Sequence, residues 1–278
     1  MKWLITGAAG MVASDLKRAL TGRGEDVVAL SKSDLDITST RRVQQAIGDA
    51  RPDVIVNCAA WTRVDDAETN EPAANAINGS AVELLAHAVN RVSSRLIHLS
   101  TDFVFDGTKR TPYEINDRTA PLSAYGRSKL LGEIAAAHAE RHVVLRSSWL
   151  FGHNGPNFVE AIRRQIVKGT NPLRVVEDQK GRPTYTPHLA EAIIRIAHSE
   201  ANGIFHYADE PECTWFDFAR AIVEELGAAI DVKPVTTAEF PRPATRPAYS
   251  VLSTERYERV TGVRPASWRE GLHEYLHA

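Results

Sequence analysis

The chain has 278 residues, of which 43% are hydrophobic and 24% charged, a composition typical of a globular protein with one domain or two closely joined ones. A formal net charge of -2 at pH 7 argues against a partner such as nucleic acid or an anionic membrane, and no apolar run is long enough to span a bilayer. The two cysteines, Cys58 and Cys213, indicate no disulfide framework, and a strand-like run follows Met1 without a signal-peptide pattern, so we expect a cytoplasmic protein.

The first predicted elements are a buried strand at residues 3–6, a glycine turn, and a helix over residues 15–21. In the turn, Gly7 permits a tight bend, Gly10 lets a pyrophosphate approach the backbone, and Ala13 allows close packing of helix on strand. The N-terminus of the helix would face the anion. This order of elements at the start of the chain predicts a nucleotide site, although similar turns also serve packing alone.

Three further strands are predicted at residues 26–30, 54–58 and 95–100, with helices between them. Thr38 is expected to cap the helix that follows the first of these strands, and the apolar residues of 72–92 recur at helical spacing. Strands that alternate with helices form a parallel sheet covered on both faces, with ligands at the carboxyl ends of the strands. We therefore predict an α/β fold with a Rossmann-type doubly wound parallel sheet.

The segment 103–122 contains glycine, prolines and charges, and is expected to be a loop over the site and not a core element. After it, Ser123 is expected to cap a helix in which Tyr125 and Lys129 lie four residues apart on one face. The ammonium would lower the pKa of the phenol from about 10, which makes Tyr125 a usable general acid. The hydroxyl of Thr101, at the end of the fourth strand, would hold the substrate oxygen that receives the proton. Alone, this Tyr-x-x-x-Lys spacing is weak evidence, because amphipathic helices often carry such pairs.

A fifth strand is predicted at residues 142–147, and from Trp149 onward the regular alternation weakens as prolines and short elements follow. We expect a dinucleotide-binding domain over residues 1–148, to which part of 185–200 returns, and a smaller C-terminal substrate-binding lobe formed mainly by residues 149–278. The lobe is expected to contain two helices and one polar loop, at residues 157–168, 215–226 and 177–184.

Motifs along nearly the whole chain resemble those of the extended short-chain dehydrogenase/reductase superfamily, and within it the dTDP-4-dehydrorhamnose reductases. The glycine turn and the Tyr-x-x-x-Lys motif mark only the superfamily. The Asp-Gln loop at 178–184 and the Arg-Pro segment at 246–252 are narrower signals. The other matching motifs lie at residues 35–38, 57–60, 64–68, 100–107, 146–149 and 157–158.

The resemblance implies a reductase that delivers hydride from a reduced nicotinamide to the ketone of a 4-keto-6-deoxy sugar nucleotide while Tyr125 donates the proton. The implied catalytic residues are Thr101, Tyr125 and Lys129, and Lys129 would also bind the nicotinamide ribose. The residues implied to line the coenzyme are Gly7, Gly10, Met11, Val12, Asp36, Ile37, Ala59, Ala60 and Trp61. Those implied to contact the substrate are Thr101, Asp102, Trp149, Asn157 and Arg182.

Three of these substrate residues have a plainer alternative: Trp149 in the core, Asp102 as a turn carboxylate, and Arg182 as a surface charge. The chain also departs from the family pattern, with Trp61 and Phe103 where tyrosines are usual, which bears on the sugar pocket. No metal ligands are predicted. The expected partner is a sugar nucleotide, with no nucleic acid and no membrane, and a homodimer is the assembly considered.

The coenzyme prediction depends on the end of the second strand. NAD sites place an acidic residue there to accept the ribose 2′-hydroxyl, but this chain has Ser31, Lys32 and Ser33. Ser31 and Lys32 would bind a 2′-phosphate, so NADPH is predicted as the preferred coenzyme and NADH as a usable one. Asp34 or Asp36 could still reach the ribose.

Two alternatives remain open. The first is another sugar-nucleotide ketoreductase, epimerase or dehydratase of the same superfamily. A dehydratase needs an acid pair after the threonine, and here Asp102 is followed by Phe103, which cannot act as a base. The second is a non-catalytic regulatory subunit, because the beta subunit of methionine adenosyltransferase is similar to these reductases. An intact Thr101, Tyr125 and Lys129 argues against it.

Overall fold

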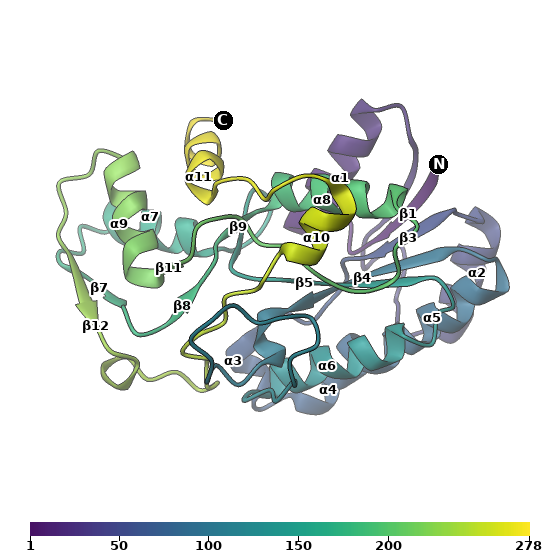
Figure 1. Ribbon diagram of the computed structural model, residues 1–278, viewed down its shortest axis with the longest axis horizontal. Helices are drawn as coiled ribbons and strands as arrows, with labels where there is room; N and C mark the ends of the chain where they lie inside the picture. The colour runs from purple at the N-terminus through teal and green to yellow at the C-terminus, as the bar shows by residue number, and fades with distance from the viewer.

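A computed structural model describes all residues, 1–278, as a six-stranded parallel sheet with helices on both faces and a smaller lobe beside it (Figure 1). The sheet has the order β10-β5-β4-β3-β1-β2, and all of its pairings are parallel. The predicted α/β fold with a doubly wound parallel sheet is therefore confirmed. The strands are β1 (Lys2–Thr6), β2 (Asp26–Leu30), β3 (Val54–Asn57), β4 (Arg95–Thr101), β5 (His142–Ser147) and β10 (Gly203–His206).

Different helices cover the two faces of the sheet (Figure 1). Along β1, Trp3 and Ile5 are buried on one face and Leu4 on the other, because successive side chains of a strand point to opposite faces. The first face is covered by α1 (Met11–Gly22), α8 (Thr186–His198) and α10 (Glu255–Thr261). The second is covered by α2 (Thr40–Ala50), α5 (Ala81–Arg91) and α6 (Ala124–Ala136). No helix combines the length and apolar character that crossing a membrane requires.

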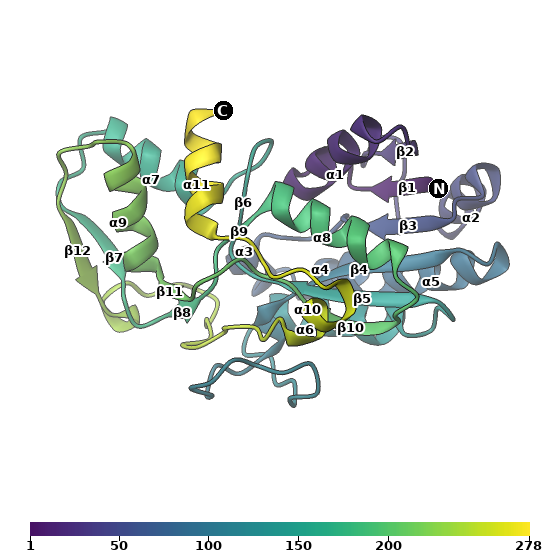
Figure 2. The same ribbon diagram turned by 45° about the horizontal axis from the view of Figure 1, so that its top comes forward.

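The smaller lobe lies beside the main sheet (Figure 2). It has its own apolar core, in which Phe151, Phe218 and Trp268 are buried. Its helices are α7 (Phe158–Val167), α9 (Trp215–Glu225) and α11 (Trp268–His277). Its short strands are β6 (Leu150–Phe151), β7 (Leu173–Val176), β8 (Lys180–Gly181), β9 (Thr184–Tyr185), β11 (Cys213–Thr214) and β12 (Val232–Val235). The chain leaves the main sheet after β5, passes into this lobe, and returns to the sheet with α8 and β10.

Two predicted helix starts are wrong. Helix α1 begins at Met11 and not at Asp15, because the extended backbone of Gly10 completes the turn and the helix follows at once. Thr38 does not cap α2. Ser39 does, accepting a 3.5 Å hydrogen bond from the Arg42 backbone N–H, while the Thr38 hydroxyl donates to the Asp36 carboxylate at 2.7 Å.

The segment 103–122 is also more buried than predicted. It contains few regular elements, but Val104, Phe105 and Tyr113 form a small apolar cluster with Leu252. The rings of Phe105 and Tyr113 stack with their centroids 4.1 Å apart. The sequence indicated a solvent loop because glycine, proline and charged residues surround these three side chains.

The predicted helical stretch over 72–92 is present but not uniform. It consists of α4 (Glu71–Asn75), a π-helical turn (Ala76–Ser80) and α5, and it is preceded by the short helix α3 (Val64–Ala67). The π-helical turn places Asn78 beside the active-site helix, as described below.

Candidate active site

Helix α6 carries the predicted proton-transfer pair. The hydroxyl of Ser123 accepts a 3.1 Å hydrogen bond from the Gly126 backbone N–H, so the helix begins where the sequence predicts. Tyr125 and Lys129 therefore lie one turn apart. A side chain at Gly126 would place its Cβ 2.3 Å from the Phe103 carbonyl oxygen, so glycine allows the helix to approach the end of β4.

The structure brings Thr101, Asp102 and Tyr125 together at the carboxyl end of β4. The Thr101 hydroxyl donates to Asp102 Oδ1 at 3.0 Å and accepts from the Phe103 backbone N–H at 3.2 Å. The same hydroxyl lies beside the Tyr125 phenol, and its interaction with the phenol acts to lower the pKa of Tyr125 against the larger effect of burial. The ring of Phe103 packs edge-on against Tyr125, with centroids 5.5 Å apart. Two hydroxyls and a carboxyl group thus meet at one point.

The predicted effect of Lys129 on Tyr125 is wrong in this arrangement. Burial raises the pKa of Tyr125 to about 12, which the Thr101 hydroxyl opposes and the Asp102 carboxylate reinforces. The Lys129 ammonium donates instead to the Leu99 carbonyl oxygen of β4 at 2.5 Å. Burial lowers the pKa of Lys129 to about 8. Desolvation therefore outweighs the attraction that the spacing of the two residues suggested.

Asp102 is buried, with 1% of its surface exposed. Burial raises its pKa to about 6, although the hydroxyls of Ser250 and Thr101 partly offset the rise by hydrogen bonding. Its second oxygen, Oδ2, has no hydrogen-bond partner within the protein. A buried acceptor of this kind is normally satisfied, so Asp102 can hold a ligand hydroxyl beside Tyr125.

The glycine turn has the shape that a dinucleotide requires. Gly7 has a positive φ of 69°, and a Cβ there would lie 2.8 Å from the backbone of Ala59 at the end of β3. Helix α1 then begins at Met11 without a side-chain cap and without an acidic residue in its first turn. Its first N–H groups are therefore available to an anion, as a pyrophosphate site needs. Val12 is buried in the sheet core, so only its backbone can take part.

The end of β2 carries charges of both signs, whereas the sequence suggested mainly a cation and two hydroxyls. Ser31 donates from both its backbone N–H (2.9 Å) and its hydroxyl (2.6 Å) to the Asp34 carboxylate, which holds the pKa of Asp34 below its usual range. Lys32 is exposed, and after the hydrogen bonds from Thr38 its charge is among the causes that lower the pKa of Asp36. Asp36 is exposed and accepts from Thr38, whereas Ile37 is buried in the core. A cation and an ionised carboxylate thus lie at the same strand end.

Asn78 connects the segment after β3 to α6, and nothing in the sequence indicated this role beyond an asparagine in an apolar helix. Its side-chain oxygen accepts from the Trp61 backbone N–H at 2.8 Å, and its nitrogen donates to the Trp61 carbonyl oxygen (3.0 Å) and the Ser128 hydroxyl (2.9 Å). Ser128 in turn donates to the Tyr125 carbonyl oxygen at 2.7 Å. The segment that contains Ala59, Ala60 and Trp61 is therefore fixed to α6.

Two predicted substrate residues have clear structural partners in the smaller lobe. The indole of Trp149 stacks on Trp215 with ring centroids 3.6 Å apart, and its backbone has a positive φ of 48°.

Asn157 caps α7, accepting from the Glu160 backbone N–H at 3.1 Å and donating to the Gly152 carbonyl oxygen at 2.8 Å. The Asn157 side chain also lies 4.0 Å from the sulfur of Met11, on the side of the glycine turn. Their contacts with a substrate stay predictions.

The side chain of Arg182 is only 12% exposed, and its Nε and Nη1 atoms are buried. Its Nη1 lies 3.4 Å from a Glu210 carboxylate oxygen, without the alignment of a hydrogen bond, and its Nε also has no acceptor. A buried cation with unsatisfied donors is suited to an anionic ligand such as a phosphate.

Residues 237–250, which we call the strap, join the smaller lobe to the active site. At one end, the Thr237 backbone N–H donates to the Asp178 carboxylate at 2.8 Å. At the other, Pro247 and Ala248 lie so close to Gly107 that a Cβ on this glycine would be 2.7 Å from their backbone, and Ser250 reaches Asp102. The strap therefore crosses from the lobe to the residues beside Tyr125.

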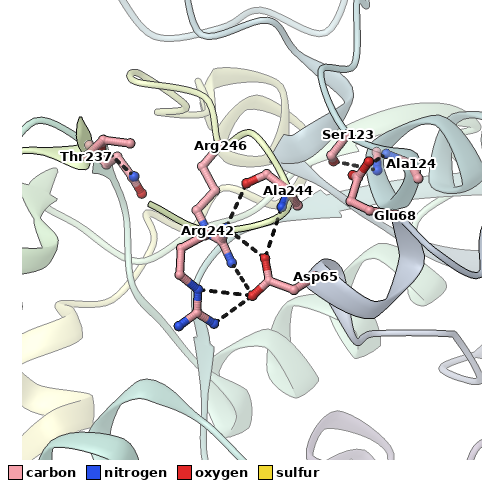
Figure 3. Close-up of polar contacts among 10 residues, drawn as sticks. Asp65, Glu68, Ser123, Ala124, Thr237, Arg242, Ala244 and Arg246 are labelled. Atoms are coloured by element: carbon pink, nitrogen blue, oxygen red, sulfur yellow. Dashed lines mark hydrogen bonds and ion pairs between the residues drawn. The ribbon is translucent and has the colours of Figure 1, made fainter. Parts of the chain in front are cut away.

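Asp65 of α3 holds the middle of the strap (Figure 3). Its carboxylate accepts from Arg242 Nη2 at 2.6 Å, from the Ala244 backbone N–H at 3.2 Å and from Arg246 Nη1 at 3.1 Å. These contacts lower the pKa of Asp65 to about 2 even though burial opposes the change. One turn further along the chain, Glu68 accepts from the Ala124 backbone N–H at 2.8 Å, at the start of α6. Thus α3 contacts both the strap and α6.

The fold and the site define a reductase of the extended short-chain dehydrogenase/reductase type, as predicted. A model of the "RmlD substrate binding domain" family matches residues 1–278. The chain belongs to this family, and the resemblance to dTDP-4-dehydrorhamnose reductases is confirmed.

Three relatives illustrate the similarity. The chain is 46% identical to a probable dTDP-4,6-dihydroxy-2-methyloxan-3-one 4-ketoreductase from Streptomyces antibioticus, over 99% of this chain and 94% of that protein. It is 43% identical to dTDP-4-dehydrorhamnose reductase from Mycobacterium tuberculosis, over 97% and 90%. The crystal structure of dTDP-4-dehydrorhamnose reductase from Bacillus anthracis in complex with NADP superimposes with a TM-score of 0.95 at 35% identity, covering 100% of this chain and 99% of that one.

Proposed function

We infer that the protein reduces the 4-keto group of a 4-keto-6-deoxy sugar nucleotide, and that dTDP-4-dehydrorhamnose, which becomes dTDP-rhamnose, is its substrate. The meeting of Thr101, Asp102 and Tyr125 at the end of β4, on the helix that also carries Lys129, is the observation that carries this proposal. Curated relatives over nearly the full length are named as 4-ketoreductases or dTDP-4-dehydrorhamnose reductases, which supports it. When bound, a nicotinamide coenzyme supplies the hydride.

In the proposed reaction Tyr125 donates a proton to the carbonyl oxygen of the sugar. A pKa of about 12 keeps the phenol protonated, so the proton is present before the reaction begins. An alkoxide is a stronger base than a phenolate, so the transfer remains favourable at this pKa. The Thr101 hydroxyl donates a hydrogen bond to the same oxygen, while the Lys129 ammonium stays on the Leu99 carbonyl oxygen and does not tune the phenol.

Other residues hold the substrate and the coenzyme in this proposal. Oδ2 of Asp102 accepts a sugar hydroxyl, Trp149 packs against the sugar, and Arg182 pairs with the diphosphate of the nucleotide. Asn157 orients the loop that faces the nucleotide. The turn from Gly7 to Val12 and the segment 59–61 line the coenzyme, and Lys129 also binds the nicotinamide ribose.

The proposal is tested by mixing the purified chain and NADPH with dTDP-4-keto-6-deoxyhexose and following coenzyme oxidation, with product analysis by chromatography. We expect oxidation that depends on the keto sugar, and none with dTDP-glucose, because Phe103 occupies the position where a dehydratase needs a second acid. A 4-keto product from dTDP-glucose and catalytic oxidised coenzyme would indicate a dehydratase. Coenzyme binding without any turnover would indicate the regulatory-subunit alternative.

Coenzyme choice is the first quantitative prediction. We expect wild-type protein to favour NADPH over NADH in kcat/KM, since Lys32 is an exposed cation at the end of β2. Lys32→Ala should reduce this ratio several-fold, as a single exposed lysine-phosphate contact contributes about 1 kcal/mol. Asp34→Ala is the matched variant of opposite sign, because it removes the carboxylate that would repel a 2′-phosphate. A ratio that neither variant changes would show that this strand end does not set the preference.

The strap gives a second prediction. Asp65→Asn should raise KM for the sugar nucleotide about tenfold, because it removes the charge that pairs with Arg242 and Arg246 and loosens the strap next to Asp102. KM for the coenzyme should stay near the wild-type value. The control is Asp66→Asn, which alters an exposed neighbour on the same helix that pairs only with Arg63. Equal effects of the two substitutions would contradict a role for the strap.

The sugar-nucleotide partner is part of this proposal. The cytoplasmic location and the homodimer are not tested by these experiments and stay predictions. Sedimentation analysis would decide whether the protein forms a homodimer.

A further inference from the structure

A cluster of potential metal ligands lies outside the active site, where α9 meets the C-terminal helix α11 (Figures 1 and 2). His273 and His277 are four residues apart on α11, so their rings project from the same face of the helix. Glu225, the last residue of α9, lies opposite them. One ligand atom from each of the three residues falls within 4.8 Å of the other two.

The three side chains already converge on one point. Nδ1 of His273 lies 2.5 Å from Glu225 Oε1, and Nε2 of His277 lies 3.0 Å from the same oxygen. The two imidazole rings are tilted by 46° with their centroids 4.5 Å apart. Ligands about 2.1 Å from a tetrahedral ion are separated by roughly 3.4 Å, so only small side-chain shifts would bring these atoms to coordination distances.

The chemistry of the set selects a class of ion. Two imidazole nitrogens and one carboxylate oxygen are a ligand set that zinc and neighbouring transition metals accept, with a fourth position left for water. A single protein oxygen is too little for Mg²⁺ or Ca²⁺, which prefer oxygen ligands. Each histidine would bind the ion through one unprotonated ring nitrogen. Both histidines are more than half exposed, so an ion has direct access.

We propose that Glu225, His273 and His277 form a binding site for Zn²⁺ or a similar transition-metal ion, which links α9 to α11 in the smaller lobe. Helix α11 packs in the core of this lobe through Trp268 and Leu272, and its last turn ends at His277 next to the C-terminus. A bound ion would fix this last turn to α9. The site is separate from the proposed reaction and does not depend on it.

The test uses the full chain without a histidine tag. Zn²⁺ is titrated in competition with a chromogenic chelator, and the melting temperature and amide hydrogen exchange are measured with Zn²⁺ or Mg²⁺. We expect one saturable Zn²⁺ site, a rise in Tm of about 5 °C at a hundredfold excess over Kd, slower exchange in α11, and no effect of Mg²⁺. The double substitution His273→Ala/His277→Ala should abolish all three Zn²⁺ effects, and Glu225→Gln should weaken binding at least about tenfold.

A second group of histidines supplies the control. His87 and His138 flank Glu83, but their nitrogens lie 3.8 and 3.6 Å from its carboxylate, beyond hydrogen-bond distance, and their ring centroids are 6.3 Å apart. The substitution His87→Ala/His138→Ala should leave Zn²⁺ binding unchanged. Absence of a saturable site in the wild type, or survival of the site in the α11 double variant, would overturn the proposal.

Discussion

Tyr125→Phe should lower turnover with the keto sugar nucleotide about a hundredfold or more and leave coenzyme affinity close to that of the wild type. The substitution removes the proton that the reaction needs but hardly changes the volume of the side chain, so the packing of Phe103 against the ring is retained. Steady-state kinetics give kcat, and quenching of protein fluorescence gives the Kd for NADPH.

The matched control is Tyr275→Phe in the smaller lobe. Its hydroxyl donates to Glu160 at 2.9 Å and accepts from Asn157 at 3.3 Å, but it is not part of the cluster around Thr101, so its loss bears on KM for the sugar nucleotide and not on the proton transfer. Its loss should cost about 1 kcal/mol of stability and leave kcat nearly unchanged. Near-normal turnover in the Tyr125 variant would exclude this phenol as the acid, whatever its effect on stability.

Glu133→Gln should reduce the free energy of unfolding by about 3 kcal/mol, the largest stability effect that we expect from a near-isosteric change. Glu133 and Arg146 are 5% and 2% exposed and form a bidentate pair across α6 and β5, with distances of 2.8 and 2.7 Å. Ser100 donates a further hydrogen bond of 2.5 Å to Glu133. The glutamine would leave the buried guanidinium without its counter-charge, and urea unfolding measures the difference.

Glu191→Gln provides the comparison for that measurement. Glu191 and Arg23 form an equally short ion pair of 2.6 Å, but their side chains are 40% and 42% exposed. Water and salt screen such a pair, so we expect a loss below about 1 kcal/mol. Equal losses in the two variants would mean that the pair between α6 and β5 does not depend on burial for its strength.

Local signals predicted most of the sheet and the catalytic helix. The apolar runs that became β1 to β5 and the Ser123 cap of α6 depend on residues next to one another in the chain, so their structural meaning could be read from the sequence. Strand β10 could not, because a four-residue strand has too short a pattern and exists only through its pairing with β5. The same limit applies to the two-residue strands of the smaller lobe.

Some residues of the candidate site could be predicted from the sequence, and others could be found only in the structure. Thr101, Tyr125 and Lys129 were identified by their spacing and motifs, and the structure places them around the end of β4. Asp65 and Asn78 were missed as site residues because their partners are distant in sequence: Arg242 lies 177 positions from Asp65, and Ser128 lies 50 from Asn78. No periodicity or motif spacing links such pairs.

The sequence by itself determined strands β1 to β5, the glycine turn, and which side chains occupy one face of α6, since all of these follow from neighbouring residues and helical geometry. Only the tertiary structure decided how those side chains are charged. The spacing of Tyr125 and Lys129 predicted a lowered phenol pKa, but packing directs the ammonium to the Leu99 carbonyl oxygen and removes water from both groups. Desolvation and hydrogen bonding depend on what surrounds a group in space, so the ionisation of the site is a property of the folded chain.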